Sequence, residues 1–331
     1  MYNYSNHYLM ERFERAISNN QIDIIKEILS NNKIFLNSHN KEGLYPIHIA
    51  VKNNSIEVLD LLLSLGDDIN IKTKYIYSSD YSELTSLELS CKENNFEMVK
   101  YLIEKGANLH ISKYGTLLYS SINNIEISKY LIERGVNIET QYNSAVFYAI
   151  YEKAFDFIKL IFELKVPFKA YNNNNNSLLM ESCRNGNYEI VKFLIEKGFD
   201  VNKENYYSES PIINACYSGN LDIIILLIEN GANYILKRSI YNYCKHSLSI
   251  TKFFLEKGVP LTRDIIYSYY EKYNYSYKEV IFYLIENNFI NPNTLFNCYF
   301  SIKDISIISS IQDNIFSIEI INNNIQKIIS S

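Results

Sequence analysis

Apolar and polar positions alternate along this 331-residue chain in a ten-residue phrase that returns many times. A clear copy, Glu189 to Gly198, consists of an acidic residue, a mostly apolar stretch, a basic residue and a glycine. Its apolar positions cover most of a helix circumference, which is typical of a helix packed between neighbours. The glycine follows the helix end, where a left-handed backbone is needed. The phrase therefore predicts a short helix closed by glycine.

Further copies of the phrase end at glycines spread along the chain. From Gly198 to Gly231 the interval is 33 residues. A unit of this size cannot bury its apolar face alone, so the units must stack on one another. The phrase and its weaker copies predict helices near residues 22–30, 56–64, 96–104, 125–133, 155–163, 188–196, 221–229, 249–256, 278–286 and 304–312.

A second phrase precedes the helix in the first complete unit. There the chain reads Tyr45-Pro46-Ile47-His48-Ile49-Ala50, and Ser210-Pro211-Ile212-Ile213-Asn214-Ala215 is a weaker copy. At a period of 33 residues, this opening resembles the Thr-Pro-Leu-His-x-Ala opening of the ankyrin repeat family. The resemblance covers about residues 10 to 312. It implies an all-α ankyrin-repeat solenoid of about ten stacked helix-turn-helix units with short hairpin loops.

The repeat spacing also predicts how the chain is organised. We expect an N-terminal capping repeat at 1–39, ankyrin repeats at 40–312 that are degenerate after about 235, and a C-terminal capping helix at 313–331. Every solenoid needs its open apolar ends covered. A docking motif is the alternative for the C-terminal segment, but the continued repeat spacing favours a cap.

Two units depart from the period. Between Gly66 and Gly106 the spacing is 40 residues, and the additional segment, 73–79, is expected to leave the stack at a hairpin tip. Between Gly106 and Gly135 the spacing is only 29 residues, which indicates that this unit has lost part of its turn. Loops that leave a repeat scaffold are frequent recognition sites.

Charge and composition exclude several classes of partner. The net charge is -5, with acidic and basic residues interleaved, so no basic stripe predicts a nucleic-acid partner. No apolar run is long enough for membrane insertion, and the first residues do not form a signal peptide. We expect a cytoplasmic monomer, located in a host cell if the source is a virus or a parasite.

Candidate chemistry points to structural roles. Cys91, Cys183 and Cys216 occupy equivalent positions after the small residue of the inner helix, so we expect core thiols and neither disulfides nor a metal site. His48 is expected to brace the turn between units by hydrogen bonding. No nucleophile motif, metal motif or phosphate loop is found. The chain is therefore expected to be no enzyme and to bind no cofactor.

The resemblance implies a protein–protein interaction scaffold that binds another protein through its concave face and hairpin tips. An alternative is a substrate-recognition adaptor or regulatory subunit of a larger complex such as a ubiquitin ligase, because ankyrin proteins often carry a docking motif for that purpose.

Carrying the ankyrin register along the chain predicts which side chains face a partner. Tyrosine is enriched at interfaces, and the chain has 30 tyrosines, although an AT-rich genome also explains that abundance. If these side chains do not bind, the convex side or the region from Tyr267 to Tyr277 is the next candidate. The register places Lys41 and Lys52 on this surface, and the expected partner-binding residues are Tyr75, Tyr77, Tyr81, Lys92, Tyr151, Tyr206, Tyr207 and Tyr217.

Overall fold

The computed structural model describes residues 2–31, 33–76, 81, 83–112, 117–139, 144–235, 240–244 and 247–260, with single positions at 280, 283, 284, 287 and 289. The expected helix at 304–312 and the expected cap at 313–331 lie outside these residues. Most of the expected helix at 278–286 does so too. The described residues divide into two compact units, Met1–Pro211 and Ile212–Ser331.

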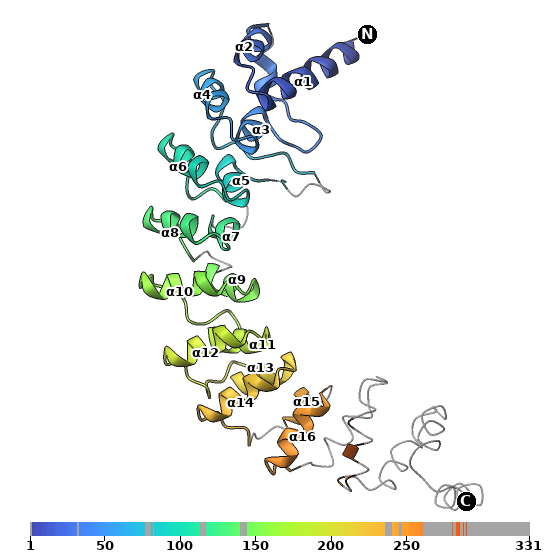
Figure 1. Ribbon diagram of the computed structural model, residues 1–331, viewed down its shortest axis with the longest axis vertical. Helices are drawn as coiled ribbons and strands as arrows, with labels where there is room; N and C mark the ends of the chain where they lie inside the picture. Colours follow the sequence, from blue (N-terminus) through green and yellow to red (C-terminus); the bar gives the residue numbers. More distant parts are fainter. Residues whose placement is uncertain are drawn as a thin grey trace, which may run out of the picture. The chain divides into compact units, whose positions relative to one another are not determined.

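Unit 1 is a stack of helix pairs with one inner and one outer row (Figure 1). It begins with the long helix α1 (Tyr2–Ser18) and contains the short 3-10 helix η1 (Lys33–Asn37). The outer row consists of α2 (Ile22–Asn31), α4 (Ile56–Ser64), α6 (Phe96–Glu104), α8 (Ile125–Glu133), α10 (Phe155–Glu163) and α12 (Tyr188–Glu196). The inner row consists of α3 (Pro46–Lys52), α5 (Ser86–Lys92), α7 (Leu118–Ser121), α9 (Ala145–Tyr151) and α11 (Leu178–Arg184).

Unit 2 repeats the same pairing in its described part. Its helices are α13 (Pro211–Ser218), which starts at the boundary, α14 (Leu221–Glu229), α15 (Tyr241–Cys244) and α16 (Leu248–Glu256). The buried Tyr241 donates its hydroxyl to the carbonyl oxygen of Val259 over 2.8 Å. This bond ties α15 to the segment that follows α16.

Four helices, α6, α8, α12 and α14, begin where an asparagine caps them. The side-chain oxygens of Asn95, Asn124, Asn187 and Asn220 each accept a hydrogen bond from the backbone N–H three residues later. Such a cap satisfies one of the unpaired N–H groups of the first turn. Among the described residues, the predicted helices from 22–30 to 249–256 are confirmed with their ends within one residue. Pro46 and Pro211 begin their helices, where a missing N–H costs nothing.

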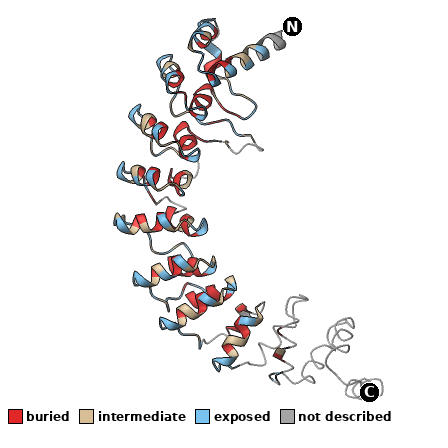
Figure 2. Cartoon of the chain, in the orientation of Figure 1, coloured by how far each residue is buried: buried red, intermediate tan, exposed pale blue. Residues whose placement is uncertain are grey.

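The core lies between the two helix rows and between successive pairs. Figure 2 shows buried positions along both helix rows of unit 1. Fully buried side chains recur at equivalent places in the outer helices, for example Leu62, Leu102 and Leu194. Each inner helix packs on the next along the row, as do most of the outer helices. Each pair therefore contributes one layer of apolar side chains to a continuous core, as the stacking argument requires.

His48 braces the first complete unit, as expected. Its Nδ1 accepts a hydrogen bond from the backbone N–H of Tyr45 over 3.2 Å, and its Nε2 lies 3.1 Å from the carbonyl oxygen of Ile71. Burial lowers the pKa of His48 to about 4, so the imidazole is neutral at physiological pH. The neutral ring then donates from Nε2 and accepts at Nδ1, which joins α3 to the turn of the following unit.

The additional segment does not leave the stack at its start. Thr73 is buried and exchanges backbone hydrogen bonds with the other side of a hairpin, to Leu84 over 2.9 Å and from Glu83 over 3.2 Å. Lys74 donates its N–H to the carbonyl oxygen of Gly43 over 2.8 Å. The expectation that the whole segment projects is therefore wrong for these two residues. The backbone of Thr73 pairs across its own hairpin, and that of Lys74 bonds the preceding hairpin at Gly43.

The cysteines of the described residues are buried, as expected of core thiols. They are Cys91, Cys183, Cys216 and Cys244. Burial raises the pKa of the Cys91 and Cys183 thiols well above the ordinary value. A thiol in this state is neither a nucleophile nor a metal ligand at neutral pH.

Candidate functional site

A groove of about 980 Å³ lies over the inner helices α5, α7, α9 and α11 of unit 1 and the hairpin turns beside them. Five aromatic side chains, four charged side chains and several asparagines line it. We call it the tyrosine groove. Its aromatic side chains are Tyr119, Phe147, Tyr148, Tyr151 and Tyr171, and its charged side chains are Lys92, Glu139, Lys169 and Glu181.

The shortest inner helix lies under the groove. α7 spans 4 residues, whereas α5 and α9 on either side span 7 each. Lys92, Ser121 and Tyr151 are the last residues of α5, α7 and α9, so the three helices end at equivalent positions. At that position α7 carries a small serine, whereas Lys92 and Tyr151 both line the groove. The unit that was expected to have lost part of its turn contributes Tyr119 to the lining.

The aromatic side chains form a partly exposed wall. The ring centroids of Tyr119 and Tyr148 lie 4.6 Å apart with an angle of 46° between the planes. Tyr151 follows on the same helix and is 69% exposed. Burial, the negative charge of Glu139 and the neighbouring Tyr148 together raise the pKa of Tyr119 to about 12, so its hydroxyl stays protonated.

The two carboxylates are held in place by the turns. Glu139 Oε1 accepts hydrogen bonds from Ser144 Oγ over 2.8 Å and from the backbone N–H of Lys169 over 3.1 Å. Glu181 Oε1 accepts from the side-chain amides of Asn172 and Asn176 over 2.8 and 2.7 Å. Within the part of the chain that the structure describes, neither carboxylate forms an ion pair.

The asparagine run at 172–176 forms a hairpin tip, and its side chains hold that tip in place. Asn172 Oδ1 accepts hydrogen bonds from the backbone N–H groups of Asn174 and Asn176, both over 3.0 Å. Asn205 closes the next tip in the same way with Tyr207 and Glu209. Asparagine side chains favour such turns because they can bond their own backbone nearby.

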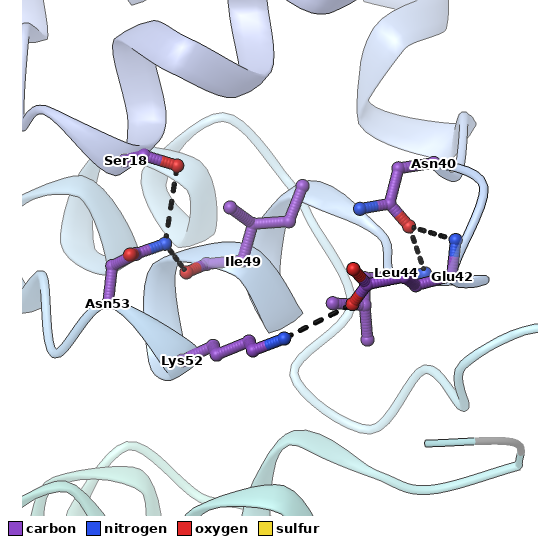
Figure 3. Close-up of polar contacts among 7 residues, drawn as sticks. All are labelled: Ser18, Asn40, Glu42, Leu44, Ile49, Lys52 and Asn53. Carbon is purple, nitrogen blue, oxygen red and sulfur yellow. Dashed lines mark hydrogen bonds and ion pairs between the residues drawn. The ribbon is translucent and has the colours of Figure 1, made fainter. Parts of the chain in front are cut away.

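Two of the expected partner-binding residues line the groove, namely Lys92 and Tyr151. Tyr81 lies beside it between two ammonium groups: Lys52 Nζ is 4.4 Å and Lys92 Nζ is 5.0 Å from its ring centroid. Lys52 also pairs with Glu42 over 3.1 Å, near the turn that Asn40 closes (Figure 3). The expected exposure of Lys41 and Lys52 is found.

The remaining expected residues are distributed elsewhere. Tyr75 is exposed next to the hairpin of the additional segment, and Tyr77 lies outside the described residues. Tyr206 and Tyr207 are exposed at a hairpin tip, where the N–H of Tyr206 lies 3.4 Å from the carbonyl oxygen of Asn174 at the groove. Tyr217 belongs to unit 2, is exposed, and has its ring 5.2 Å from that of Tyr243.

Sequence reasoning missed several groove residues, including Tyr119, Tyr148, Glu139 and Glu181. One signal could have found two of them. Tyr148 and Glu181 each lie four residues after the serine that caps their inner helix, and thus one turn along the same face. The register used above considered only positions near the end of that helix.

Two further tests of the site have simple outcomes. No group of His, Cys, Asp or Glu able to hold a metal ion occurs among the residues that the structure describes. Across the same ranges, no helix has the length and apolar character needed to cross a membrane.

Comparisons with known proteins agree on one family. A family model described as "Ankyrin repeats (3 copies)" matches residues 13–113, 87–170 and 146–238. The crystal structure of the human ASB11 ankyrin repeat domain is similar to this chain, with a TM-score of 0.51. The alignment covers 60% of this chain and 90% of that domain. The sequence identity is 20%, so this likeness concerns the fold alone.

Curated relatives match over shorter stretches. Alpha-latrocrustotoxin-Lt1a of Latrodectus tredecimguttatus is 40% identical over 52 residues, 16% of this chain and 4% of that protein. A putative ankyrin repeat protein of Acanthamoeba polyphaga mimivirus is 35% identical over 104 residues, 29% of this chain and 12% of that protein. One of Rickettsia bellii is 36% identical over 66 residues, 19% of this chain and 10% of that protein. The matches thus span only a small part of each relative.

Proposed function

Because the chain belongs to the ankyrin repeat family, we propose that it is a non-enzymatic scaffold that binds a partner protein in the tyrosine groove. Ankyrin repeats generally mediate protein–protein interaction, and proteins built from them are typically not enzymes. The observation that carries the proposal is the hollow over α5, α7, α9 and α11, with its aromatic wall. Tyrosine at such a wall supplies a large contact area at a low cost in side-chain entropy.

The hairpin tips next to the groove extend the proposed surface. Tyr206 and Tyr207 are 75% and 63% exposed, and Asn205 beneath them donates its amide to Asn176 Oδ1 over 2.6 Å. The two successive tips are therefore held together by their own hydrogen bonds. A surface organised before binding loses less entropy when the partner arrives. Tyr206 and Tyr207 are thus proposed as the rim of the binding surface.

Photo-crosslinking from the groove tests the proposal. A benzoylphenylalanine at position 151 should crosslink the partner in cells of the source organism. The same residue at position 8 is the control, because Tyr8 is also exposed but lies on α1, away from the groove. Products formed equally from both positions, or only from position 8, would contradict a groove that binds protein.

Substitutions complete the test. The double variant Tyr151→Ser, Tyr207→Ser should lose the partner while its melting temperature stays that of the unchanged chain, because both side chains are exposed. Tyr8→Ser is the matched control and should keep the partner. Truncating an interface tyrosine at a hot spot typically costs about 2 kcal/mol or more of binding free energy. Unchanged capture by the double variant would place the interface elsewhere.

A further inference from the structure

We propose that the centre of the tyrosine groove is a socket for one basic side chain, an arginine or a lysine, in an extended segment of the partner protein. The socket consists of the rings of Tyr119, Tyr148 and Tyr151 and the carboxylate of Glu139. The inference rests on the proposed function, since it names the chemistry of the segment that the groove takes.

The first support is the aromatic geometry. The faces of aromatic rings attract cations, and an arginine guanidinium also stacks on them. Tyr119 on α7 and Tyr148 on α9 come from successive inner helices and lie 4.6 Å apart between ring centroids, tilted by 46°. Both side chains line the groove, so the pair of rings is within reach of an occupant. Tyr151, one turn further along α9 than Tyr148, continues this wall.

The second support is the fixed carboxylate. Ser144 caps α9 and donates its hydroxyl to Glu139 Oε1, and Tyr148 lies one turn later on the same face of that helix. Glu139 therefore lies at one end of the aromatic wall, held by Ser144 and by the N–H of Lys169. Both of these hydrogen bonds reach Oε1, which leaves Oε2 for a ligand. The charge acts on Tyr119, whose pKa it helps to raise.

The third support is that this negative charge is not neutralised within the described part of the chain. Lys169 and Lys92 line the same groove, yet neither pairs with Glu139 or with Glu181. Lys92 lies over the ring of Tyr81 instead. An occupant with a basic side chain over Glu139 and acidic side chains near Lys92 and Lys169 would match three of the four charged side chains of the lining, while Glu181 keeps its two asparagine donors.

The experiment selects peptides on the full chain. A phage-displayed library of random linear peptides is enriched on the immobilised protein, and the recovered peptides are sequenced. We expect one position of the enriched peptides to be arginine or lysine, with acidic residues flanking it. Affinities are then measured by fluorescence anisotropy with the best recovered peptide and with the same peptide after its basic residue is replaced by glutamine.

Glu139→Gln is the decisive variant. Glutamine keeps an oxygen that can accept from Ser144 and Lys169 but removes the negative charge, so the groove keeps its shape. The recovered peptide should bind the Glu139→Gln variant about tenfold or more weakly than it binds the unchanged chain. The glutamine-substituted peptide should bind the two proteins with nearly equal affinity. Glu152→Gln is the matched control, because Glu152 is an exposed carboxylate at the end of α9 outside the groove lining, and should bind as before.

The outcomes separate the two proposals. Enriched peptides without a basic position, or equal affinity for the Glu139→Gln variant and the unchanged chain, would overturn the socket and leave the protein-binding groove intact. Recovery of no peptide would also count against the socket. The crosslinking from position 151 then decides independently whether the groove binds protein at all.

Discussion

The imidazole Nε2 of His48 lies 3.1 Å from the carbonyl oxygen of Ile71, 23 residues further along the chain. The hydrogen bond connects the start of one inner helix to the turn before the next unit. The imidazole of His48 is fully buried. Backbone carbonyls buried between units need such a donor, because an unpaired one is costly. This contact makes the stability of the stack depend on pH.

Stability should fall on acidification because of His48. Its folded-state pKa of about 4 lies below the ordinary value of 6.5, so the unfolded chain takes up the proton first as the pH falls. The stabilisation is present above pH 6.5 and is lost progressively toward pH 4. His48→Leu should cost about 1 to 3 kcal/mol at pH 7.5 by leaving Ile71 and Tyr45 unpaired. In urea unfolding, the difference in free energy of unfolding between the unchanged chain and the His48→Leu variant should be smaller at pH 5 than at pH 7.5. The same difference at both pH values would contradict the mechanism.

The helices could be predicted from the sequence because the repeated phrase encodes them locally. Between Asn95 and Gly106, for example, the cap, the apolar stretch and the terminating glycine are contiguous. The groove could not be predicted in this way. It depends on side chains from four inner helices and their turns coming together, and on Glu139 accepting a hydrogen bond from the N–H of Lys169, thirty residues later. The ankyrin register identified Lys92 and Tyr151, which are the last residues of their helices, and the serine caps would have added Tyr148 and Glu181.

Two glycines with a left-handed backbone should respond differently to substitution by alanine. Gly106 has φ +90° and open space where a Cβ would lie, so Gly106→Ala should cost only the conformational strain, about 1 to 2 kcal/mol. Gly43 has φ +81°, and its Cβ would lie 2.5 Å from the carbonyl oxygen of Lys74. Gly43→Ala should therefore destabilise more in urea unfolding. Equal destabilisation by the two substitutions would mean that the backbone at Lys74 moves away from the new Cβ without a cost in free energy.

A buried leucine tests the assigned core face. Leu194 on α12 is fully buried, so Leu194→Ala should lower the free energy of unfolding by about 2 to 5 kcal/mol. Lys192→Ala on the same helix removes an exposed side chain and should change it by less than about 0.5 kcal/mol. Chemical denaturation of both variants gives the comparison. A similar small effect in both would mean that the stack does not bury this face.

Asp67 should destabilise the fold at high pH. Asp67 stands directly after Gly66, at the position that the apolar residues Ala107 and Val136 occupy in other units. Among the described residues, its Oδ2 atom is buried and has no hydrogen-bond partner. Burial raises the pKa of Asp67 to about 7 despite the bond from the N–H of Asp68. A folded-state pKa above the unfolded value of about 3.9 means that stability is full below that pH and is lost as the pH rises through 7.

Replacing this carboxylate should therefore stabilise the chain in a pH-dependent way. Asp67→Ala should raise the free energy of unfolding on the order of 2 kcal/mol at pH 8 and by much less at pH 5, because the protonated acid is tolerated in the buried site. Glu104→Ala removes the same charge from an exposed position and serves as the control. Thermal unfolding of the variants at both pH values measures the effect. If Asp67→Ala and Glu104→Ala shift stability equally at pH 8, the gain comes from net charge and the buried carboxylate is not its cause.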